Sequence, residues 1–307
     1  MTILVAGSTG LAGSAILREL SRRNIPAIGV SSKNIDLCDR DLTFDFINEL
    51  KPTVVIDAAA KVGGILANNT HPVAFLSKNI QIQVNLMDAA YDAKVEKFIF
   101  LGSNCIYPTN CPQPIKEEYI MSGQLEPTNS AYAVAKLAGM ELIKSYRKEF
   151  GKKWVSVMPI NLYGPNDNFD LDTSHVFPAL IRKFADAVEY GLDEVILWGS
   201  GEPRREFLHV DDLARAILVV LEKYDSDIHI NIGTGFDLEI KELASKIAKI
   251  SGYNGIIYWD KSKHDGTMQK LLDIEKIRKL GWKPEISLDH GIQSTIEWYR
   301  TNKLGKI

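Results

Sequence analysis

The first thirteen residues constrain the fold more than any other part of the chain. An apolar run, Ile3-Leu-Val-Ala6, leads directly into Gly7-Ser-Thr-Gly10-Leu-Ala-Gly13, and a helix-like apolar pattern begins at Leu11. Glycines between a strand and a helix let the backbone approach a pyrophosphate, and the helix N-terminus supplies free N–H groups and a partial positive charge. The spacing therefore predicts a dinucleotide-binding loop made of Gly7, Ser8, Thr9, Gly10, Leu11, Ala12 and Gly13. A glycine-rich turn that binds nothing is the alternative.

Strand-like and helix-like segments alternate through the first half of the chain. Apolar runs expected to be strands lie at 3–6, 27–30, 54–57, 98–101 and 155–158, and amphipathic segments expected to be helices lie at 11–23, 42–50, 74–91 and 131–150. Near-continuous apolar strands separated by amphipathic helices are typical of a parallel sheet covered on both faces. We therefore expect an α/β fold with a doubly wound parallel sheet (Rossmann-like) and ligands at the carboxyl ends of its strands.

The alternation becomes less regular beyond Asn161. Helices are expected at 176–188, 210–221, 240–251, 274–280 and 288–299, and strands at 194–198 and 229–232. This pattern indicates a smaller, discontinuous α/β substrate lobe beside the sheet. We expect residues 1–165 and 206–235 to form the dinucleotide-binding domain, and residues 166–205 and 236–307 to form the substrate lobe.

Length and composition exclude several classes of protein. The 307 residues suffice for one large α/β domain or two closely joined ones. The net charge of −3 argues against a nucleic-acid partner, and no apolar run approaches the length of a membrane span. The first strand follows Met1 and Thr2 directly, so we expect no signal peptide. Cys38, Cys105 and Cys111 lack metal-like spacing and favour a reducing compartment, so we expect a cytoplasmic protein with no metal site.

Tyr132 and Lys136 stand four residues apart on a segment expected to be helical. Positions i and i+4 share one helix face, so the phenol and the ammonium point the same way. A neighbouring cation favours the phenolate and lowers the pKa of a tyrosine, and such a tyrosine can give a proton to an oxygen that is gaining charge. Ser103 follows a strand end, where ligands collect. A turn hydroxyl that bonds its own backbone is the competing interpretation of Ser103.

Several longer segments resemble the extended short-chain dehydrogenase/reductase family of nucleotide-sugar enzymes, and within it the branch of GDP-L-fucose synthases. They are Ala58-Ala-Ala-Lys-Val-Gly-Gly-Ile-Leu-Ala-Asn-Asn69, Leu101-Gly-Ser-Asn-Cys-Ile-Tyr-Pro108, Leu125-Glu-Pro-Thr128, Asn161-Leu-Tyr-Gly-Pro-Asn-Asp-Asn-Phe169, Ser174-His-Val-Phe-Pro-Ala-Leu180, Trp198-Gly-Ser-Gly-Glu-Pro-Arg-Arg-Glu-Phe-Leu-His-Val-Asp-Asp212 and Lys270-Leu-Leu-Asp273. The resemblance covers essentially the whole chain. It implies a bifunctional enzyme, a 3,5-epimerase and NADPH-dependent 4-reductase acting on GDP-4-keto-6-deoxy-D-mannose.

The resemblance also implies a role for each catalytic residue. Ser103 should hydrogen-bond the substrate carbonyl, Tyr132 should protonate its oxygen, and Lys136 should tune Tyr132 and hold the nicotinamide ribose. Cys105 and His175 should move the protons at carbons 3 and 5, which are acidic because the anion delocalises onto the neighbouring carbonyl. A buried small hydrophobe is the competing interpretation of Cys105, and a helix-start residue bonded to backbone is that of His175.

By the same resemblance, six residues should bind the GDP-sugar: Asn161, Lys183, Trp198, Arg205, Asp265 and Lys270. Arg205 is expected to hold the diphosphate through charge-assisted pairing. The family commonly has arginine where this chain has Lys183, and the two are not equivalent in bidentate contacts. Asp265 and Lys270 are expected at the nucleotide end, with an ordinary surface loop as the alternative.

NADP(H) is the expected cofactor. An acidic residue at the end of the second strand would favour NAD, but this chain has Ser31, Ser32 and Lys33 there, which suit a 2′-phosphate. Some family members place arginines at Thr9 and at this strand tip, and both are missing here, which weakens discrimination against NAD(H). The remaining residues expected to contact the cofactor are Ala58, Ala59, Ala60, Leu101, Gly102, Ser103, Tyr132, Lys136, Pro159, Asn161, Leu162 and His175.

Other functions fit parts of the same pattern. A carbon-4 ketoreductase for a related GDP-deoxysugar would leave Cys105 and His175 idle, and so would a simple 4-epimerase. A 4,6-dehydratase would require Thr and acidic residues where this chain has Ser103-Asn104-Cys105. A non-catalytic NADP-binding sensor would have no use for the Tyr/Lys pair. We also expect a homodimer formed by the helices at 74–91 and 131–150, on outward faces that carry Ile82, Leu86, Leu137 and Ile143, although a buried core face explains the same residues.

Overall fold

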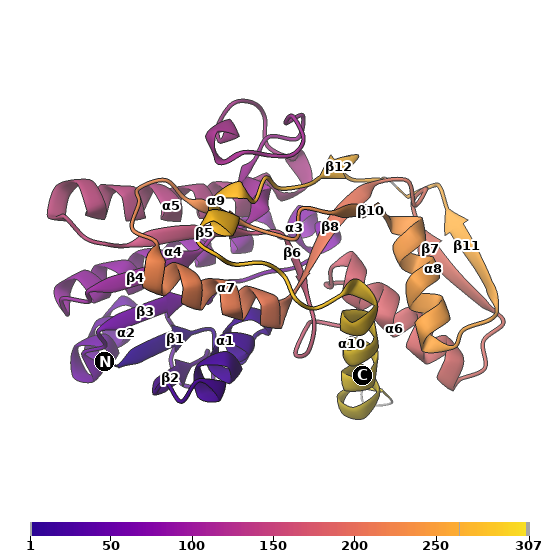
Figure 1. The fold of residues 1–307 in the computed structure, drawn as a ribbon, viewed down its shortest axis with the longest axis horizontal. Helices are drawn as coiled ribbons and strands as arrows, with labels where there is room; N and C mark the ends of the chain where they lie inside the picture. Colours follow the sequence, from indigo (N-terminus) through magenta and orange to yellow (C-terminus); the bar gives the residue numbers. More distant parts are fainter. Residues whose placement is uncertain (1, 264, 305–307) are drawn as a thin grey trace.

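A six-stranded parallel sheet forms the centre of the computed structural model, which describes residues 2–263 and 265–304 (Figure 1). Its strands, in spatial order, are β2 (Ala27–Val30), β1 (Ile3–Ala6), β3 (Val54–Asp57), β4 (Lys97–Leu101), β5 (Val155–Pro159) and β9 (Ile230–Ile232). Every neighbouring pair is parallel. The strand order reverses between β1 and β3, and such a reversal opens a crevice at the carboxyl ends where ligands bind. The doubly wound sheet expected from the sequence is confirmed.

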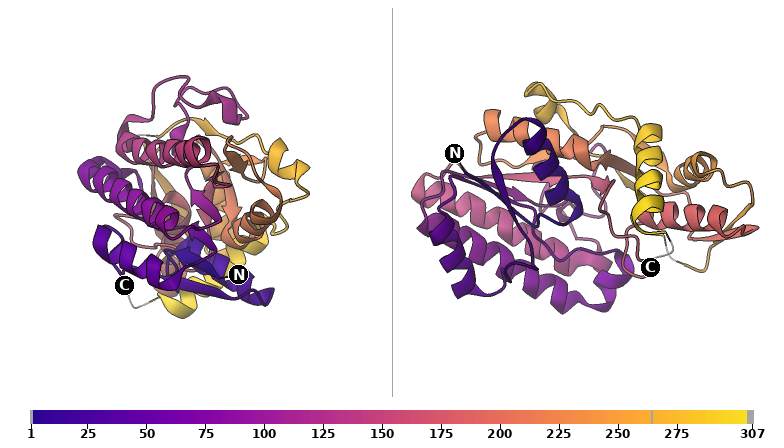
Figure 2. Two further views of the ribbon diagram at one scale, coloured as in Figure 1. Left: turned by 90° about the vertical axis from the view of Figure 1, so that its left-hand side faces the viewer. Right: turned by 90° about the horizontal axis from the view of Figure 1, so that it is seen from below.

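Helices cover both faces of this sheet (Figure 2). On one face α1 packs against α7, and on the other α4 packs against both α2 and α5. Their bounds are α1 (Leu11–Arg22), α2 (Arg40–Leu50), α4 (Pro72–Asp92), α5 (Ser130–Phe150) and α7 (Val210–Lys223). Each matches the expected helix to within two residues at either end. No helix in the described residues is long and apolar enough to cross a membrane.

The smaller lobe lies beyond the carboxyl ends of the parallel strands (Figure 1). Its helices are α6 (Val176–Glu189), α8 (Ile240–Ser251) and α10 (Leu288–Asn302), and its parallel strand pair is β7 (Glu194–Trp198) with β11 (Ile256–Asp260). A second small sheet joins the two parts: β8 (Arg204–His209) pairs with β6 (Asn161–Tyr163), β10 (Asp237–Glu239) and β12 (Gln269–Lys270). Three short helical turns, η1 (Asn104–Ile106), η2 (Glu117–Tyr119) and η3 (Pro127–Asn129), together with α3 (Ile65–Thr70) and α9 (Glu275–Lys279), complete the fold.

Two hydrophobic clusters form the core. The larger one fills the space around the parallel sheet, and the smaller one gathers α6, α8, α10 and the inner side of β7. Leu272, Ile277 and Trp282 pack in the larger cluster, although the sequence-based division placed residues 236–307 in the smaller lobe. The expected boundary between residues 205 and 206 also falls inside β8. The two parts are therefore interleaved around β8.

The apolar residues of α4 and α5 that were expected to face outward are buried or half-buried in the structure. Leu86 is 0% exposed and Ile143 is 2% exposed, so both belong to the core between the helices and the sheet. Ile82 and Leu137 are half-buried against that core. The 3.6-residue repeat of a helix predicts an apolar stripe, but it does not predict whether the stripe faces the sheet or a partner subunit. In this structure the most apolar side of each helix packs against the sheet.

Candidate active site

The glycine loop has the geometry of a phosphate cradle. Gly7 has a φ of +77°, and a Cβ there would lie 2.5 Å from the carbonyl oxygen of Ala58. A Cβ on Gly13 would lie 2.2 Å from the carbonyl oxygen of Gly7. Helix α1 follows Gly10 with no side-chain cap, so the N–H groups of its first turn have no partner within the helix. A pyrophosphate fits this uncapped helix start, because it accepts those N–H groups and favours the positive end of the dipole.

The tip of β2 offers fewer phosphate ligands than the sequence predicts. The Ser31 side chain is buried, and both its N–H and its hydroxyl donate to Oδ1 of Asn34, at 3.1 Å and 3.0 Å. Its hydroxyl oxygen also accepts from the N–H of Lys33 at 3.3 Å. Ser32 and Lys33 are exposed beside it. Ser31 therefore shapes the turn, and Ser32 and Lys33 carry the free polar groups of this tip.

A buried carboxylate at the end of β3 was missed in the sequence. Asp57 precedes the Ala58–Ala60 segment and is 1% exposed. Its Oδ1 accepts from the N–H of Ala59 at 3.0 Å, and its Oδ2 has no hydrogen-bond partner. Burial raises the pKa of Asp57 to about 6, against the opposing effect of Lys136 and of the Ala59 N–H. Asp57 directly follows the apolar residues Val54-Val-Ile56, and the sequence gave no sign that its carboxylate is buried beside Lys136.

Ser103, Tyr132 and Lys136 come together at the end of β4, as the sequence predicts. Ser103 lies near enough to Tyr132 to lower the pKa of its phenol. The Lys136 ammonium donates to the carbonyl oxygen of Leu101 at 2.9 Å and lies 5.9 Å from the centroid of the Tyr132 ring. The Phe75 ring from α4 and the Tyr132 ring form a T-shaped pair, with the ring centroids 6.4 Å apart. The phenol is thereby fixed on two sides.

The expected lowering of the Tyr132 pKa is wrong for this structure. Burial raises the pKa of Tyr132 well above its ordinary value, negative charge on Cys105 would raise it further, and the nearby Ser103 side chain opposes both. Burial also lowers the pKa of Lys136 to about 8, with Asp57 opposing the change. Desolvation disfavours charge on either group, and it is the largest cause of both shifts. A neutral phenol still suits a proton donor, because it holds its proton until an acceptor gains charge.

Cys105 lies on η1, beside the phenol, and two asparagines surround its sulfur. The side-chain amide of Asn129 donates to the sulfur at 3.5 Å, and Oδ1 of Asn104 lies 3.7 Å from it. The backbone N–H of Cys105 donates to Oγ of Ser103 at 3.3 Å. Cys105 is half-buried rather than sealed in the core. Asn129 was missed in the sequence, because nothing in Pro127-Thr-Asn129 marks an amide as a thiol ligand.

His175 is the N-cap residue of α6, and its side chain stays accessible to solvent. Protein atoms around the ring lower its pKa, which favours the neutral imidazole. The loop before it is held to the start of α3, because the N–H of Gly64 donates to the carbonyl of Thr173 at 2.8 Å. A Cβ on the adjacent Gly63 would lie 3.0 Å from the ring of Phe75, the residue that packs on Tyr132. These contacts place the His175 loop on the α4 side of the phenol.

Arg205 lies on β8 and faces a set of acidic groups. Burial lowers the pKa of Arg205, and Glu126, Asp265 and Cys105 oppose the change, in that order. Lys270 is its register partner on β12 and is buried. The Asp265 carboxylate is already occupied, because it accepts from the N–H of Ser200 at 3.0 Å and from its hydroxyl at 2.6 Å. Asp265 therefore holds the turn after β7.

Trp198 and Lys183 form a second group at the end of β7. The Trp198 side chain is 54% exposed at the end of β7. Lys183 donates to the carbonyl of Ile196 at 2.7 Å and lies 5.8 Å from the indole centroid, and Lys263 lies 5.5 Å from the same ring. Asn161 is tied to β8, because its side-chain amide donates to the carbonyl of Glu206 at 2.9 Å. An exposed indole flanked by two cations suits an aromatic and anionic ligand.

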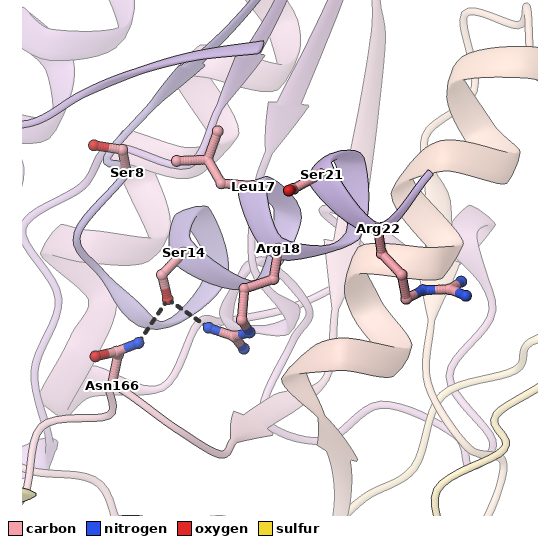
Figure 3. Close-up of a pocket in the computed structure, with 7 residues that line it drawn as sticks. All are labelled: Ser8, Ser14, Leu17, Arg18, Ser21, Arg22 and Asn166. Carbon is pink, nitrogen blue, oxygen red and sulfur yellow. Dashed lines mark hydrogen bonds between the residues drawn. The ribbon is translucent and has the colours of Figure 1, made fainter. Parts of the chain in front are cut away.

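A separate pocket of about 640 Å³ lies along the outer side of α1 (Figure 3). It is lined by Ser8, Ser14, Leu17, Arg18, Ser21, Arg22 and Asn166. Its two arginines are already paired, Arg18 with Asp211 at 2.5 Å and Arg22 with Glu19 at 2.7 Å. The pocket shares Ser8 with the glycine loop but includes none of the residues around Tyr132. We therefore do not assign the active site to it.

Comparison with known proteins gives a consistent result. A model of the NAD dependent epimerase/dehydratase family matches residues 3–233. The chain is 47% identical over 301 residues to GDP-L-fucose synthase 1 of Arabidopsis thaliana, covering 98% of this chain and 93% of that one. The structure of a GDP-L-fucose synthetase from Naegleria fowleri bound to NADP superposes with a TM-score of 0.90 at 31% identity, covering 99% and 95% of the two chains. That of a GDP-6-OMe-4-keto-L-xylo-heptose reductase from C. jejuni superposes with a TM-score of 0.93 at 33% identity, covering 98% of each.

Proposed function

Because the chain belongs to the NAD dependent epimerase/dehydratase family, we propose that it converts GDP-4-keto-6-deoxy-D-mannose to GDP-L-fucose by epimerisation at carbons 3 and 5 and NADPH-dependent reduction at carbon 4. The observation that carries the proposal is the grouping of Ser103, Tyr132 and Lys136 with a thiol, Cys105, held by the Asn129 amide. A plain reductase has no use for that thiol. An epimerase needs such a group next to the carbonyl.

The reduction uses the Ser103–Tyr132–Lys136 group. Bound NADPH supplies the hydride to carbon 4 of the sugar. Tyr132, neutral because it is buried, gives its proton to the carbonyl oxygen as negative charge develops there, and solvent later returns a proton to the phenol. Ser103 orients the carbonyl, and the Lys136 ammonium stabilises the phenolate that remains after the transfer.

The epimerisations use Cys105 and His175. Each begins with removal of the proton next to the ketone, which leaves its electron pair delocalised onto the carbonyl oxygen, and ends with return of a proton on the opposite face. The lowered pKa of His175 keeps the imidazole neutral near pH 7, the form that accepts a proton. The Asn129 amide stabilises negative charge on the Cys105 sulfur. Two groups on two sides of the sugar are required, and these residues come from separate loops.

NADP(H) is the cofactor that we propose, and a GDP-sugar is the substrate. The uncapped start of α1 takes the pyrophosphate of the cofactor, and the exposed Lys33 takes its 2′-phosphate. Arg205 and Lys270, adjacent on β8 and β12, take the diphosphate of the substrate, with Trp198 near the base.

The test is a reaction in D₂O with GDP-4-keto-6-deoxymannose and NADPH, followed by NMR of the product. We expect deuterium at carbons 3 and 5, and Cys105→Ser should reduce this incorporation by about 10²-fold or more. Thermal unfolding of the variant serves as the folding control. NADPH consumption without deuterium in the sugar would contradict the epimerase part. No NADPH consumption with any GDP-keto sugar would contradict the whole proposal and support a sensor.

A carbon-4 ketoreductase without epimerisation is the second candidate. The structural similarity to the C. jejuni GDP-6-OMe-4-keto-L-xylo-heptose reductase favours it, because that protein is named as a reductase of a GDP-4-keto sugar. The same D₂O experiment separates the two functions. A ketoreductase would give a product that keeps the original configuration and hydrogen at carbons 3 and 5.

We also propose a homodimer formed by α4 and α5. These helices pack side by side and expose apolar side chains away from the sheet: Val73 at 78%, Val134 at 44% and Phe150 at 43%. Exposed apolar residues on adjacent helices are typical of a subunit interface. Light scattering with size exclusion should give twice the 34.3 kDa chain mass, and Val134→Glu should shift it toward the monomer. A wild-type monomer at micromolar concentration would contradict this interface.

A further inference from the structure

Asp57 is a buried acid that the proposed chemistry does not use. It is the last residue of β3 and is 1% exposed. One carboxylate oxygen accepts from the N–H of Ala59, and the other has no hydrogen-bond partner. Nearly all buried polar groups in proteins are hydrogen-bonded, so an unpaired carboxylate oxygen at a site calls for an explanation.

The sheet register places Asp57 on the same side as Lys136. Asp57 pairs with Phe100 on β4, and register partners in a parallel pair point to the same face of the sheet. A Cβ on Gly139 of α5 would lie 2.5 Å from the Phe100 ring, so this face is the one covered by α5. The Lys136 ammonium lies 4.7 Å from the centroid of that ring. The carboxylate and the ammonium therefore occupy one layer between the sheet and α5.

We propose that Asp57 is a positioning residue whose carboxylate keeps the Lys136 ammonium charged and directed at the carboxyl end of β4. The inference rests on the proposed function, since it assigns the electrostatic support of the lysine used there.

The charges around the pair support this assignment. Burial lowers the pKa of Lys136 to about 8, and Asp57 is the group that opposes the change. Burial raises the pKa of Asp57 to about 6, and Lys136 is the cation that opposes it. The other titratable groups nearby are Tyr132 on α5 and Cys105 on η1, while α4 contributes the uncharged amide of Gln83. Between about pH 6 and 8 both members of the pair are charged.

A titration of the lysine side chains in the protein without cofactor tests the pair directly. Protein labelled with ¹³C at lysine Cε is titrated by NMR, and the Lys136 signal is assigned with Lys136→Arg. We expect a midpoint near pH 8 in the wild type, and a second inflection near pH 6 as Asp57 takes up its proton. Asp57→Asn should lower the Lys136 midpoint by about one pH unit. Asp45→Asn, an exposed acid on α2, is the matched control and should leave it unchanged.

Binding of NADPH, followed by its fluorescence, gives a second readout. Asp57→Asn should bind NADPH about fivefold more weakly than the wild type near pH 8, where fewer of its Lys136 side chains are charged. The two proteins should bind NADPH about equally well near pH 6, where Lys136 is charged in both. An unchanged Lys136 midpoint in a folded Asp57→Asn protein would overturn the inference. If that variant does not fold, a wild-type Lys136 signal without the inflection near pH 6 would overturn it instead. A wild type that binds no NADPH would count against the proposed function, and the titration would still decide the role of Asp57.

Discussion

Replacing Lys136 with methionine tests whether the active site is maintained at a cost in stability. The Lys136 side chain is 3% exposed, and burial lowers its pKa from 10.5 to about 8. At about 1.4 kcal/mol for each pH unit, holding this charge costs the folded protein about 3 kcal/mol near pH 7. Methionine has a similar length and no charge, so the variant avoids that cost.

One loss reduces the gain from this substitution. The carbonyl of Leu101 loses the hydrogen bond that it accepts from Lys136 at 2.9 Å, which costs about 1 kcal/mol. The pKa of about 8 already includes the attraction of Asp57. The net expectation for Lys136→Met is a gain of about 2 kcal/mol in the free energy of unfolding at pH 7, or about 3 °C in Tm for a chain of this size. Turnover should be lost in the same variant.

The pH dependence gives the sharper test. The unfolded chain keeps the lysine proton up to about pH 10.4, whereas the folded chain loses it near pH 8. Between these values the unfolded state binds more protons, so this group makes the wild type more stable as pH rises. The advantage of Lys136→Met should therefore be largest below pH 8 and should disappear toward pH 10. Thermal unfolding measured by circular dichroism from pH 6.5 to 10 checks it.

The control is Lys148→Met, an exposed lysine on the same helix. It should show no pH-dependent difference in Tm from the wild type over this range. A Lys136→Met protein that is less stable than the wild type at pH 7 by several kcal/mol would refute the reasoning. So would a stability difference that stays constant between pH 7 and 9.5.

Three further substitutions test separate parts of the site. Tyr132→Phe removes the proton donor and should lower turnover by about 10²- to 10⁴-fold while the NADPH Kd changes by less than about threefold, as measured by steady-state kinetics and fluorescence titration. Gly13→Ala places a Cβ 2.2 Å from a loop carbonyl and should abolish NADPH binding. Gly10→Ala, whose Cβ has its nearest contact at 3.4 Å, should retain most of the binding. Equal NADPH Kd values for the two variants would contradict the assignment of the glycine loop as the phosphate site. Lys33→Ala should lower the ratio of kcat/KM with NADPH to kcat/KM with NADH by about tenfold. Lys51→Ala, which changes another exposed lysine, should leave this ratio unchanged. An unchanged ratio in Lys33→Ala would show that Lys33 does not contact the cofactor.

The central sheet could be predicted because its strands are stabilised by their own apolar side chains. The runs at β1 and β3 are continuous, and each is followed by a turn or by an amphipathic segment. The strand β8 could not be predicted in this way, because its sequence, Arg204-Arg-Glu-Phe-Leu-His209, begins with three charged residues. Its Glu206 is 0% exposed and accepts from the N–H groups of Thr234, Gly235 and Leu272. Those partners lie about thirty to sixty-six residues away, and no local pattern reports them.

The same distinction between local and long-range signals applies to the residues of the site. Ser103, Tyr132 and Lys136 were predicted because they follow a strand end and share a helix face, which are local properties. Asn129 and Asp57 were missed because their roles depend on which side chain lies opposite them: a sulfur in one case and an ammonium in the other. The direction of the Tyr132 pKa was wrong for a related reason. A sequence places a cation near the phenol, but it does not show that the phenol is buried, and burial is the largest cause of its raised pKa.

Burial acts on the titratable groups of this site in a common direction, toward the neutral form, but the effect on function differs from group to group. A neutral phenol at Tyr132 and a neutral imidazole at His175 are the forms that proton donation and proton removal need, and the raised pKa of Tyr132 and the lowered pKa of His175 favour these forms. Lys136 must instead stay charged, and burial works against it. The carboxylate of Asp57, one oxygen of which has no hydrogen-bond partner, opposes the effect of burial on Lys136. The charged state of the pair is then bounded by Asp57 near pH 6 and by Lys136 near pH 8, and within this range the buried lysine keeps the charge that the proposed reaction requires.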